Sequence, residues 1–168
     1  EENRLAIRQA LDEAKRNLGR VYPLHINGKD VKTAKTLKSI NPSKSDQVVG
    51  LVCLASKEDA ENALQAAYTA YGKWKKVSAN ERADLVDRVA DLMVRDRFKL
   101  IATQVLEVGK PWAEADGDVA EAIDFCRYYA RDMRGLAKPL KVGNTPGESS
   151  KYEYLSRGVT LAIAPWNF

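Results

Sequence analysis

Cysteine, histidine and long hydrophobic runs are all scarce in this sequence, and each shortage excludes a class of function. The chain has 2 Cys and 1 His, too few for a four-ligand zinc site made of nitrogen and sulfur alone. No apolar run approaches the roughly 20 residues that span a bilayer, and the charged start Glu1-Glu2-Asn3-Arg4 lacks the apolar core of a signal peptide. We therefore expect a cytoplasmic protein with no transmembrane segment and no metal site.

A strong charge of one sign is also absent. Lys and Arg number 27 against 23 Asp and Glu, a net charge of +4. A nucleic-acid binder usually gathers its basic residues on one face, so we expect no nucleic-acid partner. The 45% of hydrophobic residues supplies enough apolar surface for a folded core. The chain does not begin with Met, which favours a piece of a longer protein.

Helical periodicity accounts for much of the chain up to residue 136. Apolar residues recur at helical spacing in four stretches. These stretches are 3–18, 56–74, 79–108 and 112–136. Ser56 with Asp59, and Ser78 with Glu81, show the pattern of a helix-opening capping box. The apolar pattern changes phase near Asp96, so the third stretch is either one helix or two.

Residues 21–55 show the pattern of short strands instead. Leu24 and Ile26 alternate with polar neighbours, Asn27-Gly28 is typical of a two-residue hairpin turn, and 48–54 is short and mostly apolar. Together they predict a small β-meander. The prolines and glycines between 138 and 150 predict a loop.

A last apolar run, Val159 to Ala164, predicts a buried strand that ends at Pro165. Such a strand needs neighbours on both edges and cover on both faces. One hairpin and one strand cannot form a doubly wound sheet, so the sequence predicts either partners that lie beyond Phe168 or a non-native arrangement of this piece when it is alone.

The residues after this strand are candidates for chemistry. Ligands of open α/β sheets bind beyond the carboxyl ends of the strands, where Pro165-Trp166-Asn167 follows. The Asn167 carboxamide has two N–H donors, and a donor at this place suits a developing oxyanion. The alternative is that Asn167 is simply a turn residue after a proline. Spacing alone leaves both interpretations open.

The segment Pro165-Trp166-Asn167-Phe168 resembles the signature of the aldehyde dehydrogenase superfamily. Within it, the chain looks most like pyrroline-carboxylate (glutamate-semialdehyde) dehydrogenase, and especially the form fused behind proline dehydrogenase in bifunctional proline utilisation A proteins. The resemblance covers nearly the whole chain. Its other motifs are 22–29, Asn41-Pro42, 106–111, 121–126, 127–130 and 157–159.

The resemblance implies an incomplete α/β fold made of helices, a small β-meander and the first strand of a Rossmann-like sheet. Residues 1–147 would be the N-terminal part of an NAD-binding domain. Residues 148–158 would be an oligomerisation hairpin, and 159–168 the truncated first central strand. The intact protein is then expected to be a homo-oligomer.

The resemblance also implies roles for single residues. Asn167 corresponds to the family's oxyanion donor. Phe168 would form one side of the substrate pocket, and Glu121 would meet the α-ammonium group of the substrate at the aldehyde entrance, although a solvated helix acid explains Glu121 as well. The stretch that would line the nicotinamide-ribose end of NAD is Ile163, Ala164, Pro165 and Trp166.

The sequence gives weaker grounds for a functional role at two other residues. Glu107 matches a position near a structural cation in some family members, but a helix acid beside Lys110 explains it as well. His25 lies in a hairpin without an obvious partner, so we assign it no catalytic role.

The activity implied for the parent is NAD-dependent oxidation of glutamate semialdehyde, formed from pyrroline-5-carboxylate, to glutamate. FAD would be a cofactor only if a proline dehydrogenase domain is fused. The family's nucleophilic cysteine, glutamate base and glycine-bearing helix for the pyrophosphate all lie downstream of this stretch, and neither Cys53 nor Cys126 has the flanking residues of the nucleophile. We expect the chain alone to be inactive. The alternatives are an aldehyde dehydrogenase of other specificity and a non-catalytic binding or assembly module.

Overall fold

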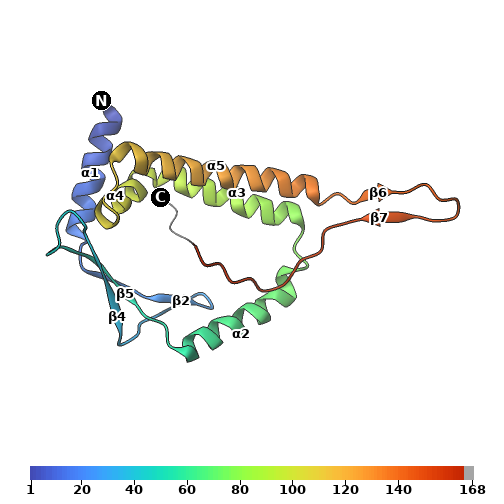
Figure 1. Cartoon of the computed structure of the whole chain (residues 1–168), viewed down its shortest axis with the longest axis horizontal. Coiled ribbons are helices and arrows are strands. Elements are labelled where there is room, and N and C mark those ends of the chain that lie inside the picture. The colour runs from blue at the N-terminus through green and yellow to red at the C-terminus, as the bar shows by residue number, and fades with distance from the viewer. Residues whose placement is uncertain (165–168) are drawn as a thin grey trace.

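A pair of long helices forms the body, with a small sheet at one end and a projecting two-stranded ribbon at the other (Figure 1). The computed structural model describes residues 1–164. The helices are α1 (Glu2–Arg16), α2 (Lys57–Trp74), α3 (Ala79–Arg95), α4 (Arg97–Glu107) and α5 (Trp112–Leu136). The strands are β1 (Arg20–Tyr22), β2 (Leu24–Ile26), β3 (Lys29–Val31), β4 (Thr36–Ile40), β5 (Val48–Cys53), β6 (Leu140–Val142) and β7 (Ser150–Tyr152).

Both predicted capping boxes are confirmed. The Asp59 amide donates to Ser56 Oγ at 3.1 Å, and the Ser56 amide donates to Asp59 Oδ2 at 2.8 Å. Ser78 and Glu81 repeat the arrangement at 3.2 and 3.0 Å. The hydroxyl and amide groups of Ser56 and Ser78 donate to the Asp59 and Glu81 carboxylates, and these hydrogen bonds hold the pKa of both carboxyls below their usual values. The starts of α2 and α3 are therefore encoded locally.

The phase change near Asp96 marks a true break. α3 ends at Arg95 and α4 begins at Arg97, with Asp96 at φ −98° and ψ 14°. The two helices then bury different faces, because α3 packs along α5 whereas α4 packs against both α1 and α5. Two helices, rather than one, occupy 79–108.

The core is small and lies where α1, α4 and α5 meet. One cluster of buried side chains joins α1 to α4, and a second joins α4 to α5. Their members are Ile7, Ala10, Leu11, Ala102 and Leu106 in the first, and Ile101, Ala115 and Val119 in the second. α2, by contrast, has no buried residue.

The prediction of a β-meander over 21–55 is wrong in its topology. The sheet order is β1-β5-β4, with β1 parallel to β5 and β4 antiparallel to it. β2 and β3 form a separate hairpin with Leu24 opposite Val31. Pro23, which has no N–H, lies between β1 and β2 and separates the two sheets. The predicted turn is confirmed, since Asn27 and Gly28 both have positive φ, 52° and 73°.

The prediction of a loop between 138 and 150 is also wrong in part. β6 and β7 pair as an antiparallel ribbon, with Lys141 opposite Lys151. The ribbon begins upstream of the range 148–158 expected for a hairpin. Its strands are only three residues long, too short for an alternating pattern to be recognised between Pro139 and the glycines at 143 and 147.

Residues 153–164, called here the C-terminal segment, are extended but form no strand. Leu161 and Ile163 are 82% and 81% exposed. No strand forms at 159–164 in the structure, and the assignment of 159–168 to the first central strand stays a prediction. The physical reason is that an apolar run becomes a buried strand only when neighbouring strands pair with it, and no described residue hydrogen-bonds to 159–164.

Candidate functional site

The seven residues proposed for the site divide into two groups. Glu121, Ile163 and Ala164 lie within the described residues. Pro165, Trp166, Asn167 and Phe168 lie outside them. The site is therefore described through the elements that lead to these four positions and through Glu121.

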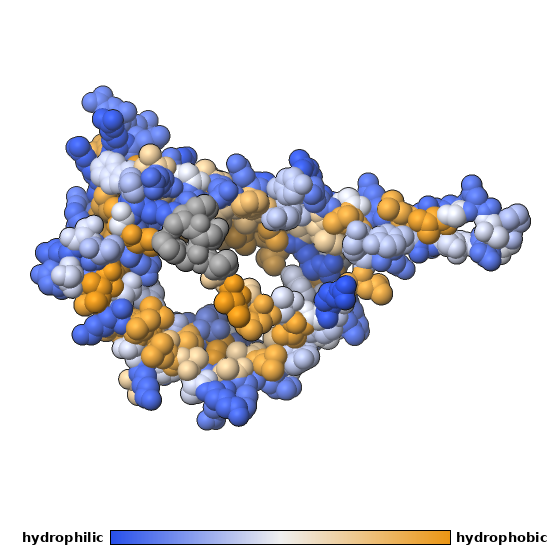
Figure 2. All heavy atoms as spheres, viewed as in Figure 1, coloured by the Kyte–Doolittle hydropathy of each residue, from blue (hydrophilic) through white to orange (hydrophobic). Residues whose placement is uncertain are grey.

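Ile163 and Ala164 lie at the end of the C-terminal segment, and both are exposed. In Figure 1 the segment runs back from the β6–β7 ribbon in the direction of α4. Figure 2 shows apolar, orange atoms around an opening through this face of the molecule. Residues 159–164 thus offer an apolar surface and main-chain donors and acceptors that no described residue occupies.

One side-chain contact joins the C-terminal segment to α2. The Tyr71 hydroxyl lies 2.7 Å from Ser156 Oγ and 3.4 Å from the Ser156 carbonyl oxygen. Two residues later, Gly158 turns the backbone with a φ of 112°, a value that L side chains rarely adopt. The contact therefore lies directly before the bend at which 159–164 begins.

Glu121 is exposed on α5 and lines a shallow depression. Its neighbours there are Gly117, Ala120, Asp124, Phe125 and Tyr128. No ion pair or hydrogen bond of the Glu121 carboxylate occurs among residues 1–164. Two carboxylates beside two aromatic rings can receive an ammonium group on a short aliphatic chain. In the described part of the chain, nothing connects this depression to Ile163 or Ala164.

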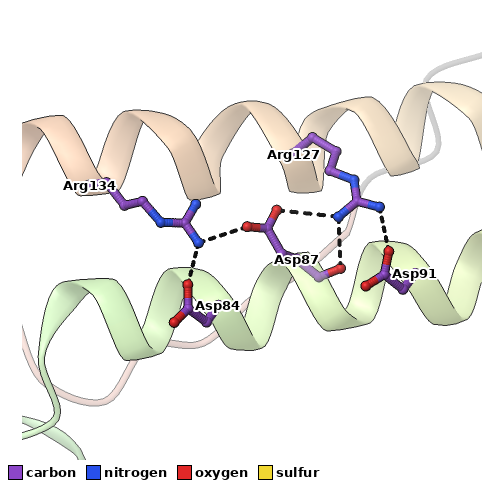
Figure 3. Close-up of polar contacts among 5 residues, drawn as sticks. All are labelled: Asp84, Asp87, Asp91, Arg127 and Arg134. Carbon is purple, nitrogen blue, oxygen red and sulfur yellow. Dashed lines mark hydrogen bonds and ion pairs between the residues drawn. The ribbon is translucent and has the colours of Figure 1, made fainter.

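A network of three aspartates and two arginines fixes α5 against α3 (Figure 3). Arg134 donates to Asp87 Oδ2 at 2.8 Å and to Asp84. Arg127 donates to Asp91 Oδ1 at 2.6 Å and to the Asp87 carbonyl oxygen at 3.2 Å. The hydrogen bond from Arg134, assisted by Arg127, lowers the pKa of the Asp87 carboxyl. This aspartate–arginine network holds the helix that presents Glu121.

The aspartate–arginine network was not predicted, although the sequence carries a signal for it. Asp84, Asp87 and Asp91 are spaced three and four apart, and Arg127 and Arg134 are spaced seven apart. Each set therefore lies on one face of its helix. Nothing in the sequence shows that the two faces meet.

The start of α5 has its own polar contacts with α4 and the turn before α5. Arg97 Nε donates to Asp116 Oδ1 at 2.6 Å, and Lys110 donates to Asp118. Both pairs involve the first two turns of α5, so this helix is fixed near both of its ends.

Glu107 and His25 have partners that the sequence did not indicate. Glu107 Oε1 accepts from Ser39 Oγ at 2.9 Å, which joins the end of α4 to β4. The expectation that His25 has no partner is wrong, because its Nδ1 lies 3.2 Å from Asp30 Oδ1 across the hairpin. Within residues 1–164 there is no group of three His, Cys, Asp or Glu that could hold a metal ion, and no helix long and apolar enough to cross a membrane.

The comparison with protein families decides the family. The model of the aldehyde dehydrogenase family matches residues 30–168. The chain belongs to the aldehyde dehydrogenase family. Among relatives within this family, it is 50% identical over all of its 168 residues to 1-pyrroline-5-carboxylate dehydrogenase of Bacillus pumilus, of which it covers 33%. It is 47% identical to 1-pyrroline-5-carboxylate dehydrogenase 2 of Bacillus subtilis over 97% of this chain and 32% of the relative.

Solved structures of the family agree. Proline utilisation A from Bdellovibrio bacteriovorus superposes with a TM-score of 0.91 at 59% identity, over 93% of this chain and 16% of that protein. 1-Pyrroline-5-carboxylate dehydrogenase from Thermus with bound NAD superposes with a TM-score of 0.85 at 45% identity, over 88% of this chain and 29% of that one. The chain spans about a third of the length of the curated relatives, 33% for the Bacillus pumilus protein, so their whole activity is not contained in these residues.

Proposed function

We propose that this chain is the N-terminal third of an NAD-dependent dehydrogenase that oxidises glutamate semialdehyde, formed from pyrroline-5-carboxylate, to glutamate. The observation that carries the proposal is the 50% identity over the whole chain to a 1-pyrroline-5-carboxylate dehydrogenase. The similarity to proline utilisation A supports the same substrate class. A fused proline dehydrogenase domain, with its FAD, would be an addition to this activity.

The residues present fit part of an NAD site. When bound, NAD supplies the hydride acceptor for the oxidation. Ile163 and Ala164 offer an exposed apolar surface and main-chain groups without a partner in residues 1–164, which suits contact with a ring and a ribose. Pro165 and Trp166 continue that stretch. The helix start that would bind the pyrophosphate is expected downstream of this chain.

Asn167 is the catalytic residue of this proposal. Its side-chain amide donates a hydrogen bond to the aldehyde oxygen as that oxygen becomes negatively charged. Phe168 lies beside it in sequence and forms one side of the pocket for the aliphatic chain. Glu121 receives the α-ammonium group of the substrate, supported by its exposed carboxylate among Asp124, Phe125 and Tyr128.

The test of this function is Asn167→Ala in the full-length protein that carries this chain. Losing one oxyanion donor is expected to lower kcat about 10²–10³-fold, with little change in NAD affinity. Asn62→Ala, an exposed asparagine on α2, is the matched control and should leave kcat unchanged. Equal kcat values for the two variants would remove Asn167 from the mechanism. The 168-residue chain alone should produce no NADH from glutamate semialdehyde.

The β6–β7 ribbon supports a homo-oligomer for the intact protein. All of its strand residues are exposed, and an isolated two-stranded ribbon is marginally stable in water, so pairing with a second subunit would stabilise it. Both cysteines are free, which agrees with a cytoplasmic location. Light scattering of the full-length protein tests the oligomer: a monomer at working concentration would refute it.

A further inference from the structure

Two parts of α5 are held in place by different contacts. Up to Ile123, the helix packs on α4 through the buried cluster that includes Ala115 and Val119. Neither buried cluster includes a residue of α3, although α3 packs along α5. Residues 124–136, called here the far part of α5, contain only one buried residue, Ala130. Large apolar side chains therefore do little to fix the far part of α5.

The buried residues of α3 are also small. They are Ala83 and Ala90, whereas the larger Leu85, Val89 and Leu92 of this helix are exposed. Packed helices usually fix their relative positions through ridges of side chains that enter the grooves of the neighbour, and alanine methyl groups form only shallow ridges. Several placements of the far part of α5 along α3 would therefore bury similar apolar areas.

The aspartate–arginine network supplies directional contacts between these two helices. Asp87 is shared, since its Oδ2 accepts from Arg134 at 2.8 Å and its carbonyl oxygen accepts from Arg127 at 3.2 Å (Figure 3). Arg127 also donates to Asp91 Oδ1 at 2.6 Å. The Arg127 and Asp91 side chains are 43% and 66% exposed, and exposed ion pairs add little to stability. Polar contacts can nevertheless select one helix register among placements of similar packing.

The far part of α5 carries half of the depression around Glu121. Glu121 lies on the part of the helix that α4 holds, whereas Asp124, Phe125 and Tyr128 lie beyond it. A helix that is fixed at one end only can pivot about that end, and α5 extends about 20 Å past Ile123 at 1.5 Å per residue. Fixing the direction of α5 therefore fixes the second carboxylate and the two rings of the depression.

We propose that Arg127 is a positioning residue: by joining α5 to Asp87 and Asp91 of α3, it fixes the far half of the depression and strengthens the preference for an aldehyde with an α-ammonium group. This inference rests on the proposed function, which places that ammonium group at Glu121. Arg127 acts through the residues next to it on α5 and not by contact with the substrate.

The test compares Arg127→Gln with Arg88→Gln in the full-length protein on two substrates, glutamate semialdehyde and glutarate semialdehyde, which lacks only the amino group. Arg88 is exposed on α3 and has no ion pair or hydrogen bond among residues 1–164. Arg127→Gln should lower kcat/KM for glutamate semialdehyde about three- to tenfold, the size expected for one hydrogen bond, chiefly by raising KM. Its kcat/KM for glutarate semialdehyde should not change. Arg88→Gln should alter neither, and a variant that only destabilised the fold would lower both.

Variants of the partner and of Glu121 sharpen the test. Asp91→Asn should reproduce the loss of selectivity, and Arg127→Lys should retain part of it because lysine keeps the charge but not the paired donors of the guanidinium. Glu121→Gln should lower the same selectivity about 10- to 100-fold, as expected for a hydrogen bond to a charged group. Adding Arg127→Gln to Glu121→Gln should lower it no further.

The outcomes separate this inference from the proposed function. If Glu121→Gln loses selectivity but Arg127→Gln keeps it, or lowers kcat/KM equally for both aldehydes, the positioning role of Arg127 is overturned and the proposed function stands. If Glu121→Gln keeps its selectivity, the ammonium site of the proposed function is refuted, and the role of Arg127 with it.

Discussion

The helical body and the C-terminal segment are held together by different means. The helical body, which here means the five helices α1 to α5, has two buried clusters, two capping boxes and the aspartate–arginine network. The C-terminal segment has one hydroxyl pair to α2 and exposed apolar side chains. Both regions carry apolar patterns in the sequence. The difference shows that an apolar pattern becomes a packed element only where a neighbour covers it.

The contrast also separates two kinds of proposed site residue. Glu121 is on α5, which is fixed to α3 and α4 by charged hydrogen bonds near both ends, so its position is set within the chain. Ile163 and Ala164 follow a bend held by the Tyr71–Ser156 contact. Both are exposed and have no hydrogen-bond partner among residues 1–164.

The two regions should differ most in the free energy of unfolding that is lost when a buried and an exposed isoleucine are each changed to alanine. Ile101 is 0% exposed between α4 and α5, whereas Ile163 is 81% exposed. Ile101→Ala should lower the free energy of unfolding by about 2–5 kcal/mol because it leaves a cavity. Ile163→Ala should change it by less than about 0.5 kcal/mol. Urea denaturation of the 168-residue chain measures both, and similar losses would mean that the C-terminal segment is packed after all.

Alanine substitutions at two glycines should change the free energy of unfolding by an intermediate amount. Gly109 has φ at 74°, and a Cβ built there would lie 2.9 Å from Pro42 Cγ, so Gly109→Ala combines backbone strain with a steric contact. We expect a loss of about 1–3 kcal/mol in the free energy of unfolding. Gly135→Ala, in α5 with open space around it, is the matched control and should stabilise the protein by about 0.5–1 kcal/mol. Thermal unfolding of the two variants should move the melting temperature in opposite directions.

The glycine at 109 also explains two motifs that were quoted from the sequence only as resemblances. Asn41 is buried, accepts from the Ser43 amide at 2.9 Å and donates to Gln47 Oε1 at 2.8 Å. This turn places Pro42 against Gly109. The motifs 41–42 and 106–111 are thus two sides of one contact.

Local features were predictable from the sequence because their physics is local. The capping boxes at Ser56 and Ser78, the hairpin turn at Asn27-Gly28 and the break at Asp96 each depend on a few adjacent residues. The parallel pairing of β1 with β5 joins residues about thirty positions apart, such as Val21 and Leu51, and no adjacent residue signals it.

In the candidate site, too, adjacent residues alone did not determine what could be predicted. Pro165 to Phe168 could be assigned roles only through the family resemblance, because spacing alone left Asn167 as either a turn residue or an oxyanion donor. The family membership is confirmed by the match over 30–168. The contact of Tyr71 with Ser156 was not predicted, since its partners are 85 residues apart in the chain.

The smallest expected effect is on the pH dependence of the free energy of unfolding. It should arise in the helical body and not in the C-terminal segment. Hydrogen bonds from Arg134 and Arg127 lower the pKa of Asp87 in the folded state. Asp87 therefore stabilises the fold above its unfolded pKa, about 3.9, and this contribution is lost as the pH falls through the lower, folded value. Asp87→Asn should make the free energy of unfolding less dependent on pH in that acid range.

Asp46→Asn is the matched control for this effect, because Asp46 is exposed and has no ion pair among residues 1–164. Urea denaturation at a series of pH values from neutral to acid should give a flatter profile for Asp87→Asn than for Asp46→Asn. Since the Asp87 side chain is still 28% exposed, the difference should diminish with added salt. Parallel profiles for the two variants would show that the aspartate–arginine network contributes nothing to the pH dependence.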